Sequence, residues 1–254
     1  GQPLAPDDRR SAAAVARIAA CAADPGGTAY INVTQTAALI ERLLGRGIYV
    51  LFLSTNQVFD GNLPQMPTDA PYSPISEYGR QKMRAEMMLR EHMARGAPAG
   101  ILRLAKVVSP KMPLVEAWAA NLAAGKTINA FSDMTLAPTP IDRVCKAITA
   151  LLHERPSGIF QLTGPRDITY TQVGRLLATR LNADLSLVRP TRARDAGLPE
   201  GSTPHHTTLE SRDLQNRYGI EVPDVGVVIE NLAAAARDSL ESTASNLTSL
   251  AARD

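Results

Sequence analysis

The chain has 254 residues, 44% of them hydrophobic, and its 27 lysines and arginines nearly balance 25 aspartates and glutamates. This length lets one large domain, or one domain with a lobe, bury a substantial core. The near-neutral charge argues against nucleic-acid and membrane-surface partners, and no apolar run approaches the roughly 20 residues of a membrane span. The first residues do not have the pattern of a signal peptide.

The two cysteines, Cys21 and Cys145, are far apart and lack the spacing of metal ligands. They favour two reduced thiols, so we expect a cytoplasmic protein. The first ten residues are polar and contain proline, which predicts a loop. Residues 33–44 carry apolar side chains at helical spacing and are followed by glycines, so they predict a helix. Asn32 is a suitable N-cap residue for that helix.

An apolar run over residues 49–53 ends in two hydroxyl residues, Ser54 and Thr55. It predicts a buried strand with hydroxyl groups at its carboxyl end. A loop rich in glycine and proline follows. The next segment suits a helix and places Tyr78 and Lys82 four residues apart, on one helical face.

These side chains suit the transfer of a proton to or from an oxygen atom. A free tyrosine has a pKa of about 10, and a cation one helical turn away favours the phenolate. We therefore expect Lys82 to lower the pKa of Tyr78, while a hydroxyl of Ser54 or Thr55 holds the substrate oxygen. The spacing by itself is also typical of a solvated surface pair.

Residues 54–61 have the sequence STNQVFDG, and YGRQK follows at residues 78–82, with Glu86 downstream. These motifs resemble the extended short-chain dehydrogenase/reductases, and within them the dTDP-4-dehydrorhamnose reductase branch. The patterns of that branch are S-T-D-Y-V-F-D-G and Y-G-x-x-K. Asn56 and Gln57 depart from the Asp-Tyr pair of the branch, which affects the expected substrate more than the expected chemistry.

The resemblance implies an α/β fold, with a Rossmann-like parallel sheet flanked by helices and a small mixed C-terminal substrate lobe. We expect residues 1–156 to form part of an NAD(P)-binding domain and residues 157–254 to form mainly the lobe and a terminal helix. The implied activity is reduction of a keto group on a nucleotide-activated sugar by NADPH or NADH. Tyr78 would donate the proton, Lys82 would lower its pKa and hold the ribose, and Thr55 would position the oxygen.

The resemblance also assigns binding residues by position. Those implied for the cofactor are Ala13, Ala14, Val15, Asn32, Ser54, Tyr78, Lys82 and Leu104. Those implied for the substrate are Thr55, Asn56, Gln57, Val58, Lys106, Pro138 and Thr139. Three of these positions also suit ordinary structure, because residues 12–15 could begin an alanine-rich helix, Lys106 could be a solvated lysine at a strand end, and Thr139 could precede a helix.

The rest of the chain predicts alternating strands and helices. Strands are expected over 99–108, 125–129, 158–164 and 185–189, and helices over 114–124, 140–152, from 168 onward and over 225–240. Residues 191–207 predict a long loop and 241–254 a frayed, polar end. The paired His205 and His206 have no further ligand at metal spacing, so no metal site is expected.

The family's glycine-rich turn, of the G-x-x-G-x-x-G kind, brings backbone amides close to the cofactor pyrophosphate. That spacing does not occur in these residues. By resemblance the chain therefore enters near the fourth strand, and either the segment lies outside these residues or the natural protein has no cofactor site. The preference between NADH and NADPH cannot be predicted without that region.

Two other functions stay open. An epimerase of the same superfamily would use the same tyrosine and lysine, whereas a dehydratase is disfavoured because Asn56 and Gln57 supply no carboxylate. A non-catalytic subunit, similar to the methionine adenosyltransferase regulatory subunits, would share the fold without turnover. In each case we expect a small-molecule ligand and neither a nucleic acid nor a membrane, and a homodimer is also open.

Overall fold

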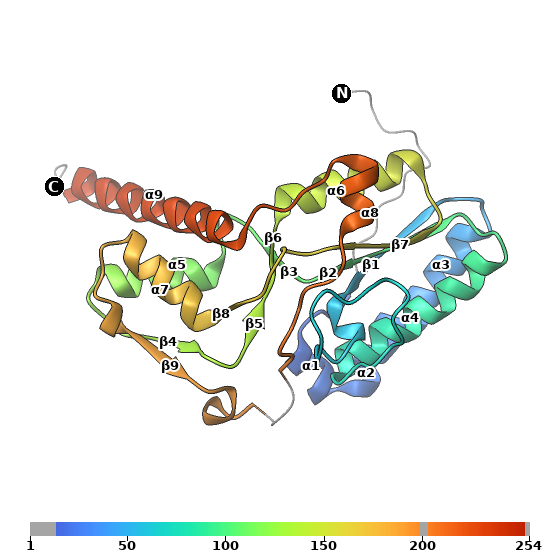
Figure 1. Ribbon diagram of the computed structural model, residues 1–254, viewed down its shortest axis with the longest axis horizontal. Helices are drawn as coiled ribbons and strands as arrows, with labels where there is room; N and C mark the ends of the chain where they lie inside the picture. The colour runs from blue at the N-terminus through green and yellow to red at the C-terminus, as the bar shows by residue number, and fades with distance from the viewer. Residues whose placement is uncertain (1–13, 199–202, 252–254) are drawn as a thin grey trace.

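The computed structural model describes residues 14–198 and 203–251, with side chains described as far as residue 242. It contains two groups of elements lying side by side, one around the strands β1, β2 and β7 and the other around α5, α7 and α9 (Figure 1). The strands are β1 (Val50–Thr55), β2 (Ala99–Leu104), β3 (Lys106–Val108), β4 (Ile128–Phe131), β5 (Thr135–Leu136), β6 (Pro138–Pro140), β7 (Gly158–Leu162), β8 (Ile168–Thr169) and β9 (Val188–Thr191).

Helices make up most of the remaining regular structure. The α-helices are α1 (Ile18–Ala23), α2 (Pro25–Ala29), α3 (Thr36–Leu44), α4 (Glu77–Ala94), α5 (Pro113–Ala123), α6 (Ile141–Glu154), α7 (Tyr170–Arg180), α8 (Arg212–Tyr218) and α9 (Val225–Ala251). A π-helix, η1 (Tyr30–Gln35), precedes α3, and the 3₁₀ turns are η2 (Asn56–Val58), η3 (Leu185–Leu187) and η4 (Ala193–Ala196). Within the described ranges, no helix is both long and apolar enough to cross a bilayer.

The strands β1, β2 and β7 form a parallel sheet in that order. Every residue of the central strand β2 is buried, because both faces of a parallel sheet are covered. Thr55 of β1 pairs with Leu104 of β2, which in turn pairs with Leu162 of β7. The three strands therefore end at one edge, where ligands bind in open α/β sheets.

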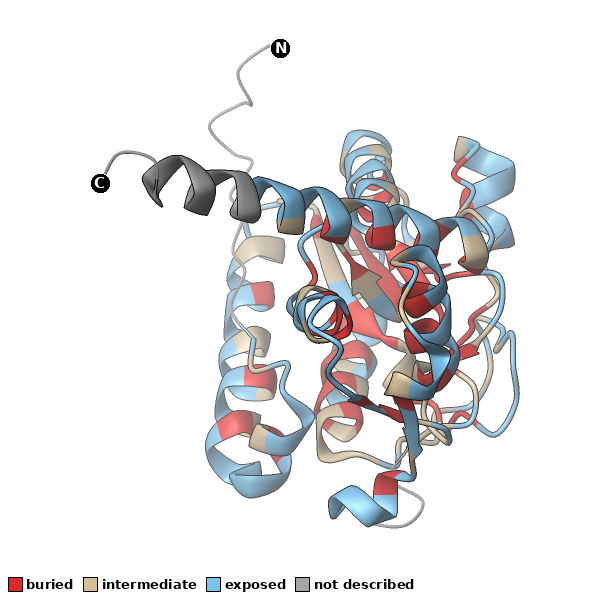
Figure 2. Ribbon diagram, turned by 90° about the vertical axis from the view of Figure 1, so that its left-hand side faces the viewer, coloured by how far each residue is buried: buried red, intermediate tan, exposed pale blue. Residues whose placement is uncertain are grey.

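Helices cover both faces of this sheet. Residues of α3 and α4, including Ile40 and Leu89, pack with Val50 and Ile101 on one face. Residues of α6 and α8 pack with Leu102 and other strand residues on the opposite face. Buried positions accordingly concentrate on the strands and on the inner sides of the helices (Figure 2).

The second group of elements has its own apolar core. Strand β4 pairs with β9 and strand β5 with β8, and the helices α5, α7 and α9 pack together beside them. Trp118 of α5 and Ile229 of α9 belong to this buried cluster. The cluster combines residues from both sides of residue 156, and the expected division of the chain at that residue stays a prediction.

Four element predictions fail at the start of an element. The helix expected from residue 168 begins at Tyr170, because residues 168–169 pair with β5 as β8. The helix expected over 33–44 begins earlier, as the π-helix η1, and Asn32 lies inside it instead of capping it. The side chain of Asn32 cannot cap because it bonds to Val15 and Gln81. The strand expected over 125–129 begins at Ile128. Residues 138–140 form β6, and α6 starts after them.

Three further predictions fail within or at the end of an element. The strand expected over 99–108 breaks at Ala105, because β2 pairs with β1 and β7 whereas β3 pairs with β6. Residues 185–187 form a 3₁₀ turn capped by Asp184, and strand β9 begins only at Val188 and runs to Thr191, into the expected loop. Helix α9 continues to Ala251, because each residue added to an existing helix gains a hydrogen bond.

Candidate functional site

The first turn of α4 lies directly against the end of β1. The hydroxyl of Ser76 accepts a hydrogen bond from the Gly79 amide at 3.0 Å and donates one to Gln57 Oε1 at 2.7 Å. A Cβ atom at Gly79 would lie 2.1 Å from the carbonyl oxygen of Gln57. Only glycine therefore permits this approach, which brings the helix that carries Tyr78 and Lys82 to the strand end.

Lys82 connects α4 to β1. Its side chain is buried, and the Nζ atom donates to the carbonyl oxygen of Leu53 at 2.8 Å while lying 4.4 Å from the centre of the Phe52 ring. Since Leu53 immediately precedes Ser54 and Thr55, the ammonium group lies beside the hydroxyl-bearing end of the strand. The structure thus places Lys82 against β1 two residues before Thr55, and Tyr78 lies one helical turn from Lys82 on the same face. The catalytic roles of the three residues stay a prediction.

Burial has opposite effects on the pKa values of the two candidate catalytic groups. Burial raises the pKa of Tyr78 to about 12, and the thiol of Cys21 nearby raises it as well. Burial lowers the pKa of Lys82 to about 8, against a smaller opposite effect of Glu86. The expected lowering of the Tyr78 pKa by Lys82 is wrong for this structure, because desolvation of the phenol is the larger effect.

The two hydroxyls at the strand end differ in their bonding. Thr55 Oγ1 accepts from the Gln57 amide at 3.2 Å and lies 3.4 Å from Asn56 Oδ1, so it caps η2. Ser54 is also buried, and its Oγ atom has no hydrogen-bond partner among the described residues. A buried hydroxyl without a partner is costly, so Ser54 is the group at this edge best suited to bond a ligand.

The predicted cofactor residues near the start of the chain lie on a short irregular segment. Ala13 is outside the described residues, and Ala14 and Val15 precede α1. Asn32 holds Val15 by two hydrogen bonds, accepting from its amide at 2.8 Å and donating to its carbonyl oxygen at 2.9 Å. Leu104 ends β2 and belongs to the apolar core under α6.

The predicted substrate residues fall into two groups. Asn56, Gln57 and Val58 form η2 at the end of β1, where Val58 is wholly buried beside Leu209 and its carbonyl oxygen accepts from the Ser73 amide at 3.0 Å, so the predicted contact of Val58 with a substrate is not open in this structure. The others lie on the paired strands β3 and β6, in which Lys106 is exposed whereas Pro138 and Thr139 are buried. Lys106 is therefore the charged side chain of this set that solvent and a ligand can reach.

A buried ion pair that sequence reasoning missed supports this edge of the sheet. Arg103 of β2 and Glu86 of α4 are both fully buried, and Arg103 Nη2 lies 2.7 Å from Glu86 Oε2. Arg103 also donates to Thr68 O and to Gln161 Oε1, and Tyr72 donates to Glu86. Glu86 follows the YGRQK motif in the sequence, but only the structure reveals that it is buried and pairs with Arg103.

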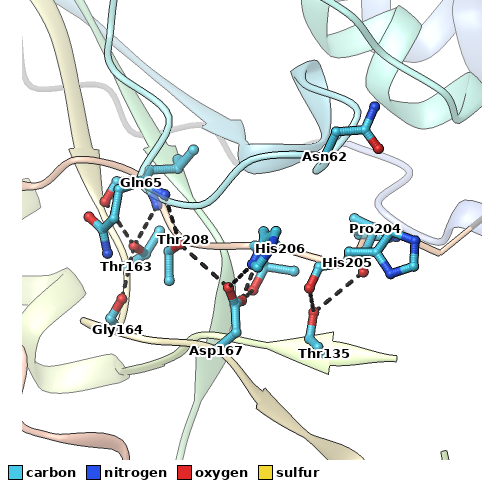
Figure 3. Close-up of polar contacts among 12 residues, drawn as sticks. Asn62, Gln65, Thr135, Thr163, Gly164, Asp167, Pro204, His205, His206 and Thr208 are labelled. Carbon is cyan, nitrogen blue, oxygen red and sulfur yellow. Dashed lines mark hydrogen bonds and ion pairs between the residues drawn. The ribbon is translucent and has the colours of Figure 1, made fainter. Parts of the chain in front are cut away.

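The segment 203–210, called the strap, joins the two groups of elements. Its amide at His206 donates to Gly61 O at 2.9 Å, and its carbonyl at His205 accepts from Thr135 Oγ1 at 2.8 Å. The carboxylate of Asp167 accepts from the Thr207 amide and hydroxyl at 2.8 and 2.7 Å. It also lies 3.1 Å from His206 Nδ1 (Figure 3).

The paired histidines therefore take part in the hydrogen bonds that hold the strap. The His206 ring lies against Asp167, and the His205 carbonyl oxygen accepts from Thr135. Within the described ranges, no group of three or more His, Cys, Asp or Glu side chains could hold a metal ion.

The fold and this geometry can be compared with known proteins. The model of the RmlD substrate binding domain family matches residues 10–237. The chain belongs to this family. The predicted resemblance and the predicted fold class are thereby confirmed.

Three curated relatives illustrate the range of this likeness. A probable low-salt glycan biosynthesis reductase, Agl14, of Haloferax volcanii is 27% identical over 238 residues, covering 89% of this chain and 76% of the relative. The dTDP-4-dehydrorhamnose reductase of Escherichia coli is 25% identical over 249 residues, covering 90% and 79%. Methionine adenosyltransferase 2 subunit beta of Xenopus tropicalis is 25% identical over 190 residues, covering 71% and 55%.

Solved structures agree on the fold. The dTDP-4-dehydrorhamnose reductase of Bacillus anthracis, in complex with NADP, matches with a TM-score of 0.73 and 16% identity, covering 87% of this chain and 77% of that one. An identity this low supports the Rossmann-type α/β architecture alone.

Proposed function

We propose that this protein is an NAD(P)-dependent reductase that reduces a keto group of a nucleotide-activated sugar. The observation that carries the proposal is the bond from Lys82 to Leu53 O, which holds the helix bearing Tyr78 against the hydroxyl-bearing end of β1. Membership in a family whose relatives include named reductases supports the same activity.

One side chain at this edge of the sheet lacks a hydrogen-bond partner, and this supports a bound nicotinamide cofactor. Ser54 Oγ is buried without a partner, and a polar ligand group at the edge would give it one. Lys82 would hold the ribose, with Val15 and Asn32 beside it. A bound NADPH or NADH supplies the hydride.

The proton in this proposal comes from Tyr78. With its pKa raised to about 12, the phenol stays protonated at neutral pH, which is the form needed to donate a proton to a ketone oxygen. Thr55 would position that oxygen, while its own bond from the Gln57 amide fixes the direction of the hydroxyl. Lys106, exposed at the start of β3, would face an anionic group of the substrate, such as a phosphate.

The test is cofactor oxidation by the purified protein, preceded by a fluorescence titration with NADPH and with NADH. We expect saturable binding, and stoichiometric oxidation when a nucleotide-activated keto sugar is added. Tyr78→Phe should abolish turnover and leave the fold intact, since it removes one hydroxyl. Tyr30→Phe is the matched control, because Tyr30 is 58% exposed and outside the site. Retained turnover in Tyr78→Phe would refute the assignment of the general acid.

The same assay separates two rival functions. An epimerase would convert its substrate without net oxidation of the cofactor. A regulatory subunit, for which the likeness to methionine adenosyltransferase 2 subunit beta is the supporting observation, would turn over no keto sugar. A homodimer stays a prediction.

A further inference from the structure

Gln81 is a buried, extensively hydrogen-bonded side chain on the inner face of α4. It is 0% exposed and lies between Tyr78 and Lys82 in sequence. Its Oε1 atom accepts from Asn32 Nδ2 at 2.8 Å. Its Nε2 atom donates to Thr28 Oγ1 at 3.0 Å, to Glu77 Oε1 at 3.1 Å and to Pro25 O at 3.3 Å.

Asn32 continues this chain of bonds to the start of the described residues. Its amide group bonds both backbone atoms of Val15, much as a neighbouring strand would. One proton of Asn32 Nδ2 goes to the Val15 carbonyl and the other is available for Gln81. The bond to Gln81 therefore fixes the plane of the Asn32 amide, and that plane aligns the Val15 bonds.

We propose that Gln81 is a positioning residue, which acts through Asn32 to fix the backbone at Val15 relative to the face of α4 that carries Tyr78 and Lys82. The consequence for catalysis rests on the proposed function, in which Val15 lies on the cofactor side and Lys82 holds the ribose. The hydrogen-bonded chain from Gln81 through Asn32 to Val15, called the clamp, does not depend on the proposed function. It is a property of the fold, because a buried amide whose hydrogen bonds are all satisfied is held in one orientation.

The test uses the whole chain with Gln81→Met, which keeps the approximate volume and removes both polar groups. Two controls accompany it. Gln161→Met removes another buried glutamine, 1% exposed, which bonds Arg103 and Met66 O at a distance from Val15. Thr28→Val removes an acceptor of Gln81 and leaves Asn32 untouched.

Amide hydrogen exchange at Val15 is the first measurement, since it needs neither cofactor nor turnover. In Gln81→Met we expect this amide to exchange about tenfold faster, as for one buried hydrogen bond lost. Gln161→Met and Thr28→Val should leave its exchange unchanged, although Gln161→Met lowers the unfolding midpoint. Unchanged exchange in Gln81→Met, or equal acceleration in Gln161→Met, would overturn the clamp.

The second measurement tests the catalytic consequence. If the wild-type protein oxidises NADPH or NADH, Gln81→Met should raise the KM for the cofactor more than it lowers kcat, whereas Gln161→Met should change neither selectively. A Gln81→Met protein with faster Val15 exchange and an unchanged cofactor KM would refute the link to the cofactor. If the wild type neither binds nor oxidises either cofactor, the proposed function fails, and the exchange result still decides the clamp.

Discussion

Replacing Arg103 with Met should destabilise the protein strongly, because it leaves a carboxylate in the core. Both side chains of the Arg103 and Glu86 pair are wholly buried, and three hydrogen bonds of 2.7 to 3.1 Å join them. In Arg103→Met the carboxylate keeps only the hydroxyl of Tyr72, which donates to it at 2.8 Å. Removing one partner of a buried ion pair costs about 3 to 5 kcal/mol.

The arginine also satisfies groups other than Glu86. It donates to Thr68 O at 3.0 Å and to Gln161 Oε1 at 3.2 Å, and it lies over the rings of Phe59 and Tyr72. We therefore expect the upper part of that energy range. With a urea slope of about 3 kcal/mol per M, the unfolding midpoint should fall by more than about 1 M.

Urea unfolding followed by circular dichroism measures this effect, in a double-mutant cycle with Glu86→Leu. If the destabilisation comes from an uncompensated charge, the variant with both substitutions should lose about 2 kcal/mol less unfolding free energy than the sum of the losses in the two single variants. Arg95→Met is the control, since Arg95 and Glu91 form an exposed pair and the loss should stay below about 1 kcal/mol. A loss below about 1 kcal/mol in Arg103→Met, or strict additivity, would refute the reasoning.

Two other predictions concern Lys82 and the strap. Because the pKa of Lys82 is lowered to about 8, the unfolded state binds more protons between pH 8 and 10.5, so the destabilisation by Lys82 is complete below pH 8 and declines above it. Lys82→Met should therefore have a free energy of unfolding up to about 3 kcal/mol higher than wild type at pH 7. Denaturant unfolding at pH 7 and at pH 9.5 should show this difference becoming smaller at the higher pH. A difference that is the same at both pH values would contradict the prediction. Asp167→Ala should lower the free energy of unfolding by about 1 to 3 kcal/mol and speed hydrogen exchange at the Thr207 amide, which loses its acceptor. Asp142→Ala is the control, because Asp142 is exposed and its loss should lower the free energy of unfolding by less than about 0.5 kcal/mol. Slow Thr207 exchange in Asp167→Ala would show that the strap is held by its other bonds.

The local sequence determined the parts of the site that adjacent residues specify. An apolar run ending in Ser54 and Thr55 is sufficient to predict a strand with two hydroxyls at its carboxyl end. The expected burial of that strand is wrong in its middle, because Leu51 and Phe52 of β1 are only partly buried and Leu53 is 42% exposed. The spacing of Tyr78 and Lys82 is sufficient to place them on one helical face. The fold class was implied by the family resemblance of residues 54–61 and 78–82, and the predicted alternation of strands and helices agrees with it.

Contacts between distant segments were decided only by the tertiary structure. The strand expected over 99–108 breaks at Ala105 because its second half pairs with residues 138–140, and no pattern within residues 99–108 encodes that partner. The same holds for the pairing of Glu86 with Arg103 and for the bonds of the strap. Each joins residues far apart in the sequence, and no local pattern specifies the partner.

The pKa of Tyr78 is the sharpest case. A cation four residues away predicts a lower pKa, and that inference uses only local spacing. The structure raises the pKa instead, because the phenol is buried and Cys21 lies near it. Burial depends on how α1, α4 and the sheet pack together. The sequence by itself therefore determined which side chains share a strand end or a helical face, and the tertiary structure decided how deeply they are buried and hence the direction in which their pKa values shift.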